Sequence, residues 1–293
     1  MELCSKGWLA GYLDKYKRLS YDVVQYFAAH IVNALEYLHS KDPEQVKKSN
    51  DIICIHRDLK PSNILIDENF GVKLTDFATA KILNCKDPKI NKILECRQDS
   101  EWRQEYDNGR RPTFVGTYEY ISPEVMESDL KPHTPMIDIW GLGIIIYELF
   151  SGITPFKGAT EMLTYQNISK GEIHFASDFP EPAKDFIEKC LKPDPTDRIG
   201  YNKEQEWVDY SSIKSHEFFA GVDFSNLDPT QVFGLMCSPK KKNSRSFAAM
   251  LNDRNKKINH MKFPTMNKNS EAYSTMDSVN QPKWVSVSLT GTK

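Results

Sequence analysis

Long hydrophobic runs are missing from this sequence of 293 residues. Its longest apolar stretch, 141–150, is interrupted by Glu148 and is far shorter than the roughly 20 residues that a bilayer-spanning helix needs. Met1 is followed by neither a basic segment nor an apolar run with a small-residue cleavage site. We therefore expect no transmembrane helix and no secretory signal.

The sequence also lacks paired cysteines and a strong net charge. Its six cysteines form no CxxC pair and lie mostly among apolar residues. This pattern favours reduced thiols in a cytosolic or nuclear chain over a disulfide framework or a zinc site, and we predict a cytoplasmic location. The 38 basic and 40 acidic side chains give a formal charge of -2, so the chain as a whole offers no case for nucleic-acid binding.

Charge is nevertheless distributed unevenly along the chain. Residues 237–293 contain nine Lys and two Arg against two Asp and one Glu, a net charge of +8, which leaves -10 for residues 1–236. This segment is rich in Asn, Ser and Lys and has no periodicity, so we predict a disordered basic tail that follows a linker over 221–236. The basic run at Lys240, Lys241, Lys242 and Arg245 would attract an acidic membrane surface weakly; the alternative interpretation is a solvated tail without a partner.

Before residue 221 the pattern is mainly helical. Apolar residues recur at spacings of three and four from Val24 to Leu38, with Ser20 as the candidate cap, which predicts an amphipathic helix. Residues 136–150 are apolar on nearly every side and predict a buried helix. Shorter helices are expected over 161–168 and 183–191. Residues 64–66 and 72–74 flank the turn ENFG and predict a short β-hairpin, so the fold class is α+β and mainly α-helical.

Two motifs carry the chemistry. The run HRDLKPSN occupies residues 56–63, and the pair Asp76-Phe77 follows just after the second strand of the hairpin. Both match signatures of protein kinases. Residues 1–220 resemble a protein-kinase-like domain, and specifically the mainly α-helical C-terminal lobe of that fold. The resemblance implies ATP and Mg²⁺ as cofactors.

The same resemblance gives each motif residue a role. Phosphoryl transfer depends on positioning and on charge neutralisation, with little covalent work for the protein. Asp58 would accept the proton of the substrate hydroxyl, and Lys60 would contact the transferred phosphate. Asn63 and Asp76 supply the oxygen ligands that Mg²⁺ prefers. The implied nucleotide site consists of Glu2, Cys4, Lys60, Asn63, Leu65 and Asp76.

Three further segments resemble parts of the kinase large lobe. The run GTYEYISPE at 116–124 is similar to the end of an activation segment, DIWGLG at 138–143 to the start of the central helix, and DPTDR at 194–198 to the late arginine motif. The resemblance implies that Glu124 pairs with Arg198 and that Asp138 anchors the backbone of the HRD loop. We expect these three residues to be structural.

The subfamily is indicated by DFATAK at 76–81, TFVGT at 113–117 and YISPE at 120–124. These segments resemble the 3-phosphoinositide-dependent protein kinase family, a branch of the AGC serine/threonine kinases. The resemblance implies transfer of the ATP γ-phosphate to Ser and Thr hydroxyls of protein substrates, in particular other AGC kinases. It also makes Thr113 the activating phosphorylation site, and a phosphate there would pair with Arg57.

The start of the chain departs from the family pattern. Residues 1–7 resemble the hinge between the two kinase lobes, and no glycine-rich loop or strand lysine precedes the first helix. We therefore expect the N-terminal β lobe to be absent, which leaves an apolar face near Leu3, Leu65 and Phe77 that needs a covering partner or the missing lobe.

Two explanations fit this departure. Either an upstream segment encodes the small lobe, which the complete catalytic loop favours, or the chain is a solitary large lobe. In the second case the alternative function is a non-catalytic interaction module, a pseudokinase or decoy.

Overall fold

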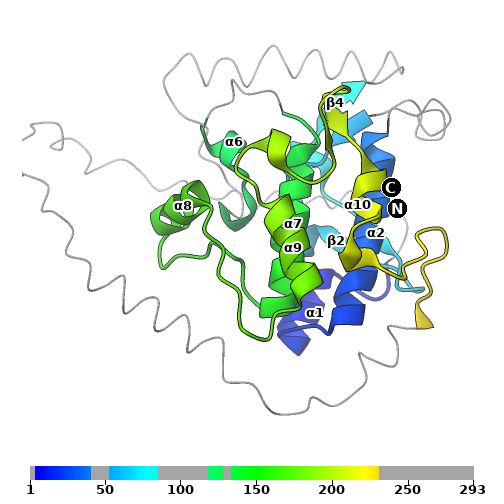
Figure 1. Cartoon of the computed structure of the whole chain (residues 1–293). Helices are drawn as coiled ribbons and strands as arrows, with labels where there is room; N and C mark the ends of the chain where they lie inside the picture. The colour runs from blue at the N-terminus through cyan, green and yellow to red at the C-terminus, as the bar shows by residue number, and fades with distance from the viewer. Residues whose placement is uncertain (1–3, 41–52, 85–117, 128–132, 231–293) are drawn as a thin grey trace, which may run out of the picture. The chain divides into compact units, whose positions relative to one another are not determined.

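Helices make up most of the described chain. The computed structural model describes residues 4–40, 53–84, 118–127 and 133–230, all of which belong to the unit Met1–Phe247. The helices, shown in Figure 1, are α1 (Leu9–Tyr16), α2 (Tyr21–His39), α6 (Pro123–Glu127), α7 (Met136–Ser151), α8 (Glu161–Lys170), α9 (Glu181–Cys190) and α10 (Tyr210–Lys214). The strands are β1 (Ile53–Ile55), β2 (Ile64–Ile66), β3 (Val72–Leu74), β4 (Lys81–Asn84), β5 (Tyr201–Asn202) and β6 (Trp207–Val208).

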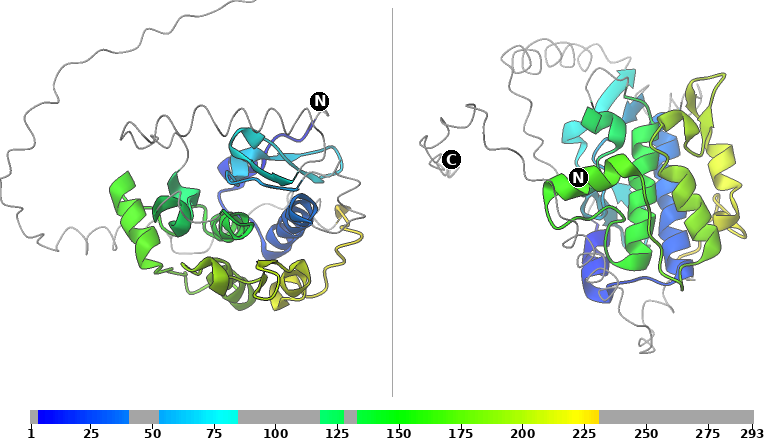
Figure 2. Two further views of the ribbon diagram at one scale, coloured as in Figure 1. Left: turned by 90° about the horizontal axis from the view of Figure 1, so that it is seen from above. Right: turned by 60° about the vertical axis from the view of Figure 1, so that its left-hand side comes forward.

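The central helix α7 is buried along its whole length, as predicted. Every residue of α7 except Glu148 is buried, because a segment that is apolar all round must lie inside the domain. The helix ends at Gly152, whose φ of 83° lies in the left-handed region that favours glycine. Figure 2 (left) shows the cyan strands on one side of α7 and α2, with α9 and α10 on the other.

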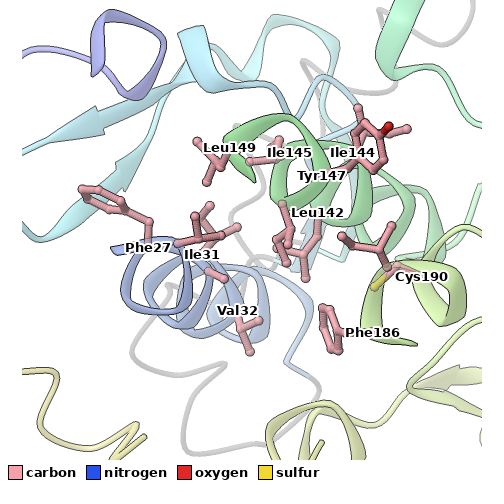
Figure 3. Packing of buried hydrophobic residues seen from close by; sticks show 14 of the residues in the cluster. Phe27, Ile31, Val32, Leu142, Ile144, Ile145, Tyr147, Leu149, Phe186 and Cys190 are labelled. Atoms are coloured by element: carbon pink, nitrogen blue, oxygen red, sulfur yellow. The ribbon is translucent and has the colours of Figure 1, made fainter. Parts of the chain in front are cut away.

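The predicted amphipathic helix is α2, and its apolar stripe faces α7. Phe27, Ile31 and Leu35 are completely buried, and Figure 3 shows Phe27, Ile31 and Val32 beside Leu142 and other residues of α7. Ser20 occupies the N-cap position, although its side chain makes no capping hydrogen bond. Burial of this stripe, which stabilises a helix by roughly 1.5–3 kcal/mol for each large aliphatic or aromatic side chain, explains why the helix forms here.

Three two-stranded antiparallel sheets complete the described part. The predicted hairpin is confirmed as β2–β3, with Ile64 opposite Leu74 and Ile66 opposite Val72. The β1–β4 and β5–β6 pairs were not predicted, because β1 and β4 are far apart in the sequence and because β5 and β6, with two residues each, are too short to show alternation. The helices predicted over 161–168 and 183–191 are α8 and α9.

The predictions about the basic tail, the small lobe and the apolar face near Leu3 are not tested by the described residues. The basic tail lies outside the described residues, as does Leu3. The absence of the small lobe also stays a prediction. Phe77 is 44% exposed and Trp8 is 51% exposed, while Leu65 is half-buried. Among the described residues, no helix is long and apolar enough to cross a membrane, and the described cysteines Cys4, Cys54 and Cys190 are free thiols.

Candidate active site

The HRD loop follows β1 and is held from below by α7. Asp138, in the first turn of α7, accepts hydrogen bonds from the backbone N–H of His56 through Oδ2 at 2.8 Å and from that of Arg57 through Oδ1 at 2.9 Å. Arg57 has a φ of 65°, an uncommon conformation for a residue with a side chain, and these two bonds help to hold it. The structure thus places Asp138 against the backbone of the HRD loop, as the resemblance to kinases implied.

Asp58, Lys60 and Asn63 form one hydrogen-bonded cluster. Lys60 Nζ lies 2.7 Å from Asp58 Oδ2, and Asn63 Nδ2 donates to the same Oδ2 at 2.9 Å and to the Asp58 carbonyl at 2.9 Å. The side chains of Asp58 and Lys60 are each 16% exposed. Both neighbours use Oδ2, so within the described chain Asp58 Oδ1 accepts no hydrogen bond.

The turn Pro61–Asn63 explains why these residues converge. This short 3₁₀ helix starts with a proline, which fixes φ and lacks an N–H that would need a partner. It brings Asn63, six residues after Arg57, back under the carboxyl group of Asp58. The amide oxygen of Asn63 accepts no hydrogen bond in the described part of the chain.

Asp76 lies where β3 ends, beside this cluster. Thr75 N donates to the Asn63 carbonyl at 3.0 Å, and the Thr75 carbonyl lies 2.9 Å from His56 Nε2. Asp76 itself has φ 64° and ψ 70°, and among the described residues its carboxylate accepts a hydrogen bond only from Ala78 N, at 3.4 Å. The residue is exposed. The backbone of β3 therefore brings Asp76 to the same edge of the site as Asn63.

The residues proposed for the nucleotide are placed in part. Leu65 lies on β2, next to Ile66. The Lys6 N–H donates to the Ile66 carbonyl at 3.2 Å, and the Ile66 N–H donates to the Gly7 carbonyl at 2.8 Å. Cys4 is half-buried two residues before Lys6, and Leu65 itself forms a β-bridge with Trp8. Glu2 is outside the described residues.

A basic group forms around the proposed regulatory arginine. Arg57 Nε donates to the Thr79 carbonyl at 2.5 Å, and Arg57 Nη1 lies 3.0 Å from His133 Nδ1. Burial, and then the positive charge of Arg57, lower the pKa of Lys81. Thr113 lies outside the described residues, so its pairing with Arg57 stays a prediction.

The structure brings Glu124 and Arg198 together inside the domain. The contact is bidentate, with Nη1 to Oε1 at 2.7 Å and Nη2 to Oε2 at 2.6 Å. Both side chains are almost fully buried. The guanidinium also lies 5.0 Å from the ring centre of Trp140, a cation–π distance.

Two clusters next to the site were missed by sequence reasoning. His39 and Tyr210 extend the hydrogen bonds of Asp138 into the core. Tyr120 donates to Glu148 Oε2 at 2.5 Å, and Thr154 donates to Glu119 Oε2 at 2.6 Å. The sequence did contain a signal for His39. It stands four positions after Leu35, on the buried face of α2, and a polar residue at a buried position needs a hydrogen-bond partner.

The residues present fit the implied metal ion. Asn63 and Asp76 offer an amide oxygen and a carboxylate, which are hard ligands suited to Mg²⁺ when phosphate oxygens and water complete the shell. Among the described residues there is no group of three or more His, Cys, Asp and Glu that would form an all-protein metal site. This donor set matches an ion that is bound jointly with a nucleotide.

The buried central helix, the HRD loop anchored to it and the cluster around Asp58 define the class of protein. The family model of the protein kinase domain matches residues 1–219, and the chain belongs to that family.

Within the family the chain resembles the 3-phosphoinositide-dependent protein kinases. It is 35% identical over 227 residues to 3-phosphoinositide-dependent protein kinase 1 of Arabidopsis thaliana, a match that covers 78% of this chain and 40% of the relative. The human protein of the same name is 35% identical, with 78% and 34% covered. Serine/threonine-protein kinase PKH1 of Saccharomyces cerevisiae is 36% identical, with 77% and 26% covered. The chain thus spans less than half the length of these relatives.

Proposed function

We propose that this chain is the catalytic large lobe of a serine/threonine protein kinase that acts in the cytoplasm on protein hydroxyls, in particular those of other AGC kinases. The proposed kinase domain covers residues 1–220, with a linker over 221–236 and the basic tail after it. The observation that carries the proposal is the cluster of Asp58, Lys60 and Asn63, because it leaves Asp58 Oδ1 and the Asn63 amide oxygen unused beside Asp76.

Each residue has a distinct task in this mechanism. Asp58 Oδ1 accepts the hydroxyl proton as the oxygen of Ser or Thr attacks, while Asn63 Nδ2 and Lys60 Nζ hold the carboxylate in one orientation through Oδ2. Lys60 also places a positive charge next to the base, where negative charge develops on the transferred group. When bound, Mg-ATP supplies the activated phosphoryl group, and Asn63 and Asp76 are the residues that would hold its metal ion.

The specificity for Ser and Thr and for AGC-kinase substrates rests on the resemblance. The printed names of the relatives describe serine/threonine and 3-phosphoinositide-dependent protein kinases. Lys60 followed by Pro61 is typical of serine/threonine kinases, and the segments around Asp76 and Glu124 match the same subfamily.

The test is phosphate transfer from Mg-ATP to a basic peptide by the purified full chain. Asp58→Asn removes the base but keeps the size of the side chain, and we expect the rate to fall by about 100-fold or more. Asp22→Asn, the same change at an exposed position on α2, should leave the rate unchanged. Equal transfer by the wild-type and Asp58→Asn chains would rule out catalysis by this site.

An interaction module is the second candidate, and one observation favours it. Phe77, which follows Asp76, and Trp8, which forms a β-bridge with Leu65, are 44% and 51% exposed. Exposed apolar groups of this size are typical of a surface that another protein covers. For this function, Phe77→Ser should abolish capture of an AGC kinase by the chain, whereas Asp58→Asn should not affect it. If neither variant changes capture, this surface is not the binding site.

A further inference from the structure

A chain of buried hydrogen bonds runs from α10 to the HRD loop. The Tyr210 hydroxyl lies 2.6 Å from His39 Nδ1, and His39 Nε2 lies 2.8 Å from Asp138 Oδ2. Asp138 in turn accepts from the backbone N–H groups of His56 and Arg57. His39, Asp138 and Tyr210 are all buried, and so are the bonds that join their side chains.

The chemistry of Asp138 fixes the direction of these bonds. Burial alone would raise the pKa of Asp138, but the hydrogen bond from His39, the charges of His39 and His56 and the Arg57 N–H bond outweigh it, so the pKa lies below its ordinary value. An ionised carboxylate only accepts hydrogen bonds. His39 Nε2 must therefore carry a proton and donate to Oδ2.

A protonated Nε2 also determines whether the other ring nitrogen, Nδ1, donates or accepts a hydrogen bond. In a neutral imidazole only one nitrogen carries a proton, so with Nε2 protonated, Nδ1 is an acceptor. A buried acceptor needs a donor, and Tyr210 is the side chain placed to supply one. Burial, followed by the charges of Asp138 and Glu36, raises the pKa of Tyr210 well above its ordinary value, which keeps the hydroxyl proton available.

We propose that Tyr210 is a positioning residue for the catalytic loop, which acts by holding His39 in the Nε2–H tautomer that Asp138 needs. The opposite tautomer would point a ring lone pair at the Asp138 carboxylate and lose the bond. Asp138 would then be held less firmly where it binds the backbone of His56 and Arg57, the two residues that precede Asp58. This inference rests on the proposed function for its catalytic meaning but not for its structural content.

The position of Tyr210 is itself defined by its surroundings. Asp209 caps α10 by accepting from Ser211 N at 2.9 Å, and Trp207 Nε1 donates to the His39 carbonyl at 2.9 Å. Both ends of the Tyr210–His39 contact are therefore tied to the β5–β6 region. A cavity of about 550 Å³ lined by His39, Trp207 and Tyr210, among others, opens next to them.

The first test reads the tautomer directly in the full chain. Nitrogen-15 NMR at pH 8, above the ordinary imidazole pKa of about 6.5, should show His39 with a protonated Nε2 and an unprotonated, hydrogen-bonded Nδ1. Disappearance of the signal in His39→Gln assigns it among the seven histidines. A protonated Nδ1 in the wild-type chain, as the other tautomer or as imidazolium, would overturn the proposal without any further variant.

The second test compares two tyrosines. Tyr210→Phe removes the donor to His39, and Tyr147→Phe removes a bond of the same length, 2.6 Å, to the His174 carbonyl outside the relay. We expect the His56 and Arg57 amides to exchange with solvent about fivefold faster or more in Tyr210→Phe, and at the wild-type rate in Tyr147→Phe. Equal exchange in both variants would contradict the proposal.

The third test separates this inference from the proposed kinase activity. If the wild-type chain transfers phosphate, Tyr210→Phe should lower kcat about tenfold with little change in KM, since the loop and not a binding contact is disturbed. An unchanged kcat in Tyr210→Phe would count against the positioning role. If the wild-type chain transfers no phosphate, the proposed function fails, whereas the tautomer and exchange measurements still decide whether the relay holds the loop.

Discussion

Arg198 shows how much one side chain can hold. Its five N–H donors reach both oxygens of Glu124 and the carbonyls of Met136, Lys192 and Pro193. Arginine is the only side chain with this many donors in a fixed plane. It joins α6, the start of α7 and the loop after α9.

The Arg198→Ala variant should therefore unfold more readily than the wild-type domain. Removing one partner of a buried ion pair leaves the other charge uncompensated, and we expect a loss of about 3–5 kcal/mol in the free energy of unfolding, measured with urea. The double variant Glu124→Leu/Arg198→Met should lose less than the two single changes combined. A loss below about 1 kcal/mol for Arg198→Ala would mean that the pair is not buried as described.

Glu148 predicts a pH dependence near neutrality. Burial, only partly offset by the hydrogen bond from Tyr120, raises its pKa to about 7; the charges of Glu119 and Asp14 add to the rise and Lys157 opposes it. The folded state thus binds this proton more tightly than the unfolded chain. Its contribution to stability is full below about pH 4.5 and is lost as the pH rises through about 7.

The matched variants are two Glu→Gln changes at tyrosine-bonded glutamates. Glu148→Gln should flatten the fall in stability between about pH 4.5 and 7, because its amide does not ionise. Glu161 accepts a hydrogen bond from the Tyr165 hydroxyl at 2.8 Å on the exposed surface of α8. Glu161→Gln should therefore leave the pH profile as in the wild type. Thermal unfolding between pH 5 and 9 measures both, and identical profiles for all three chains would contradict the assignment to Glu148.

At the scale of single residues, the pattern of the sequence predicted what is local, whereas the long-range contact of Glu124 with Arg198 was implied by the resemblance to kinases. Asp58, Lys60 and Asn63 lie within six positions of one another in a single motif, and the resemblance of that motif to kinases implied that they act together. His39 and Tyr210 are 171 positions apart, and Tyr120 and Glu148 are 28 apart. Such pairs meet only because helices pack, and no local pattern records which polar residue will meet which.

Among the elements, the contact between α7 and α9 depends on a glycine. A Cβ on Gly143 would lie 2.7 Å from Cys190 Cβ and 2.9 Å from Leu191 Cδ2, which is closer than atoms approach without movement of a helix. The two helices can come this near only because position 143 has no side chain.

Two Gly→Ala changes in helices test this packing. Gly143→Ala should destabilise the domain by about 1–3 kcal/mol through overpacking. Gly11→Ala in α1, where the nearest atom would be at an ordinary 3.7 Å, should be neutral or stabilise by up to about 1 kcal/mol, because alanine favours a helix. Urea unfolding of both variants gives the comparison, and a stabilised Gly143→Ala chain would refute the close approach.

The elements also show why some structure was predictable and some was not. Helix α7 was evident because burial on all sides requires an apolar sequence throughout, and β2–β3 because a short turn joins its strands. In contrast, β1 pairs with β4, with Ile55 opposite Lys81, across a long separation. Strand length and separation, more than composition, limited the prediction.

For the whole molecule, the uneven charge predicts a salt-sensitive surface interaction. Replacing Lys240, Lys241, Lys242 and Arg245 with Gln in the full chain should abolish binding to phosphatidylserine vesicles. Binding by the unaltered chain should be measurable at about 0.05 M salt and largely lost at about 0.15 M, because four basic residues contribute only about 1 kcal/mol each near an anionic surface. Sedimentation with vesicles measures it, and equal binding by both chains would place the contact elsewhere.

The complete burial of α7 has a consequence for biosynthesis. Cys190, the last residue of the helix that covers one side of α7, follows Ser151 by 39 positions. At roughly 5–20 residues per second, a ribosome takes several seconds to add that stretch. During this interval the most apolar segment of the nascent chain has emerged, or is emerging, before its cover exists, so newly made chains should depend on chaperones that recognise extended hydrophobic segments.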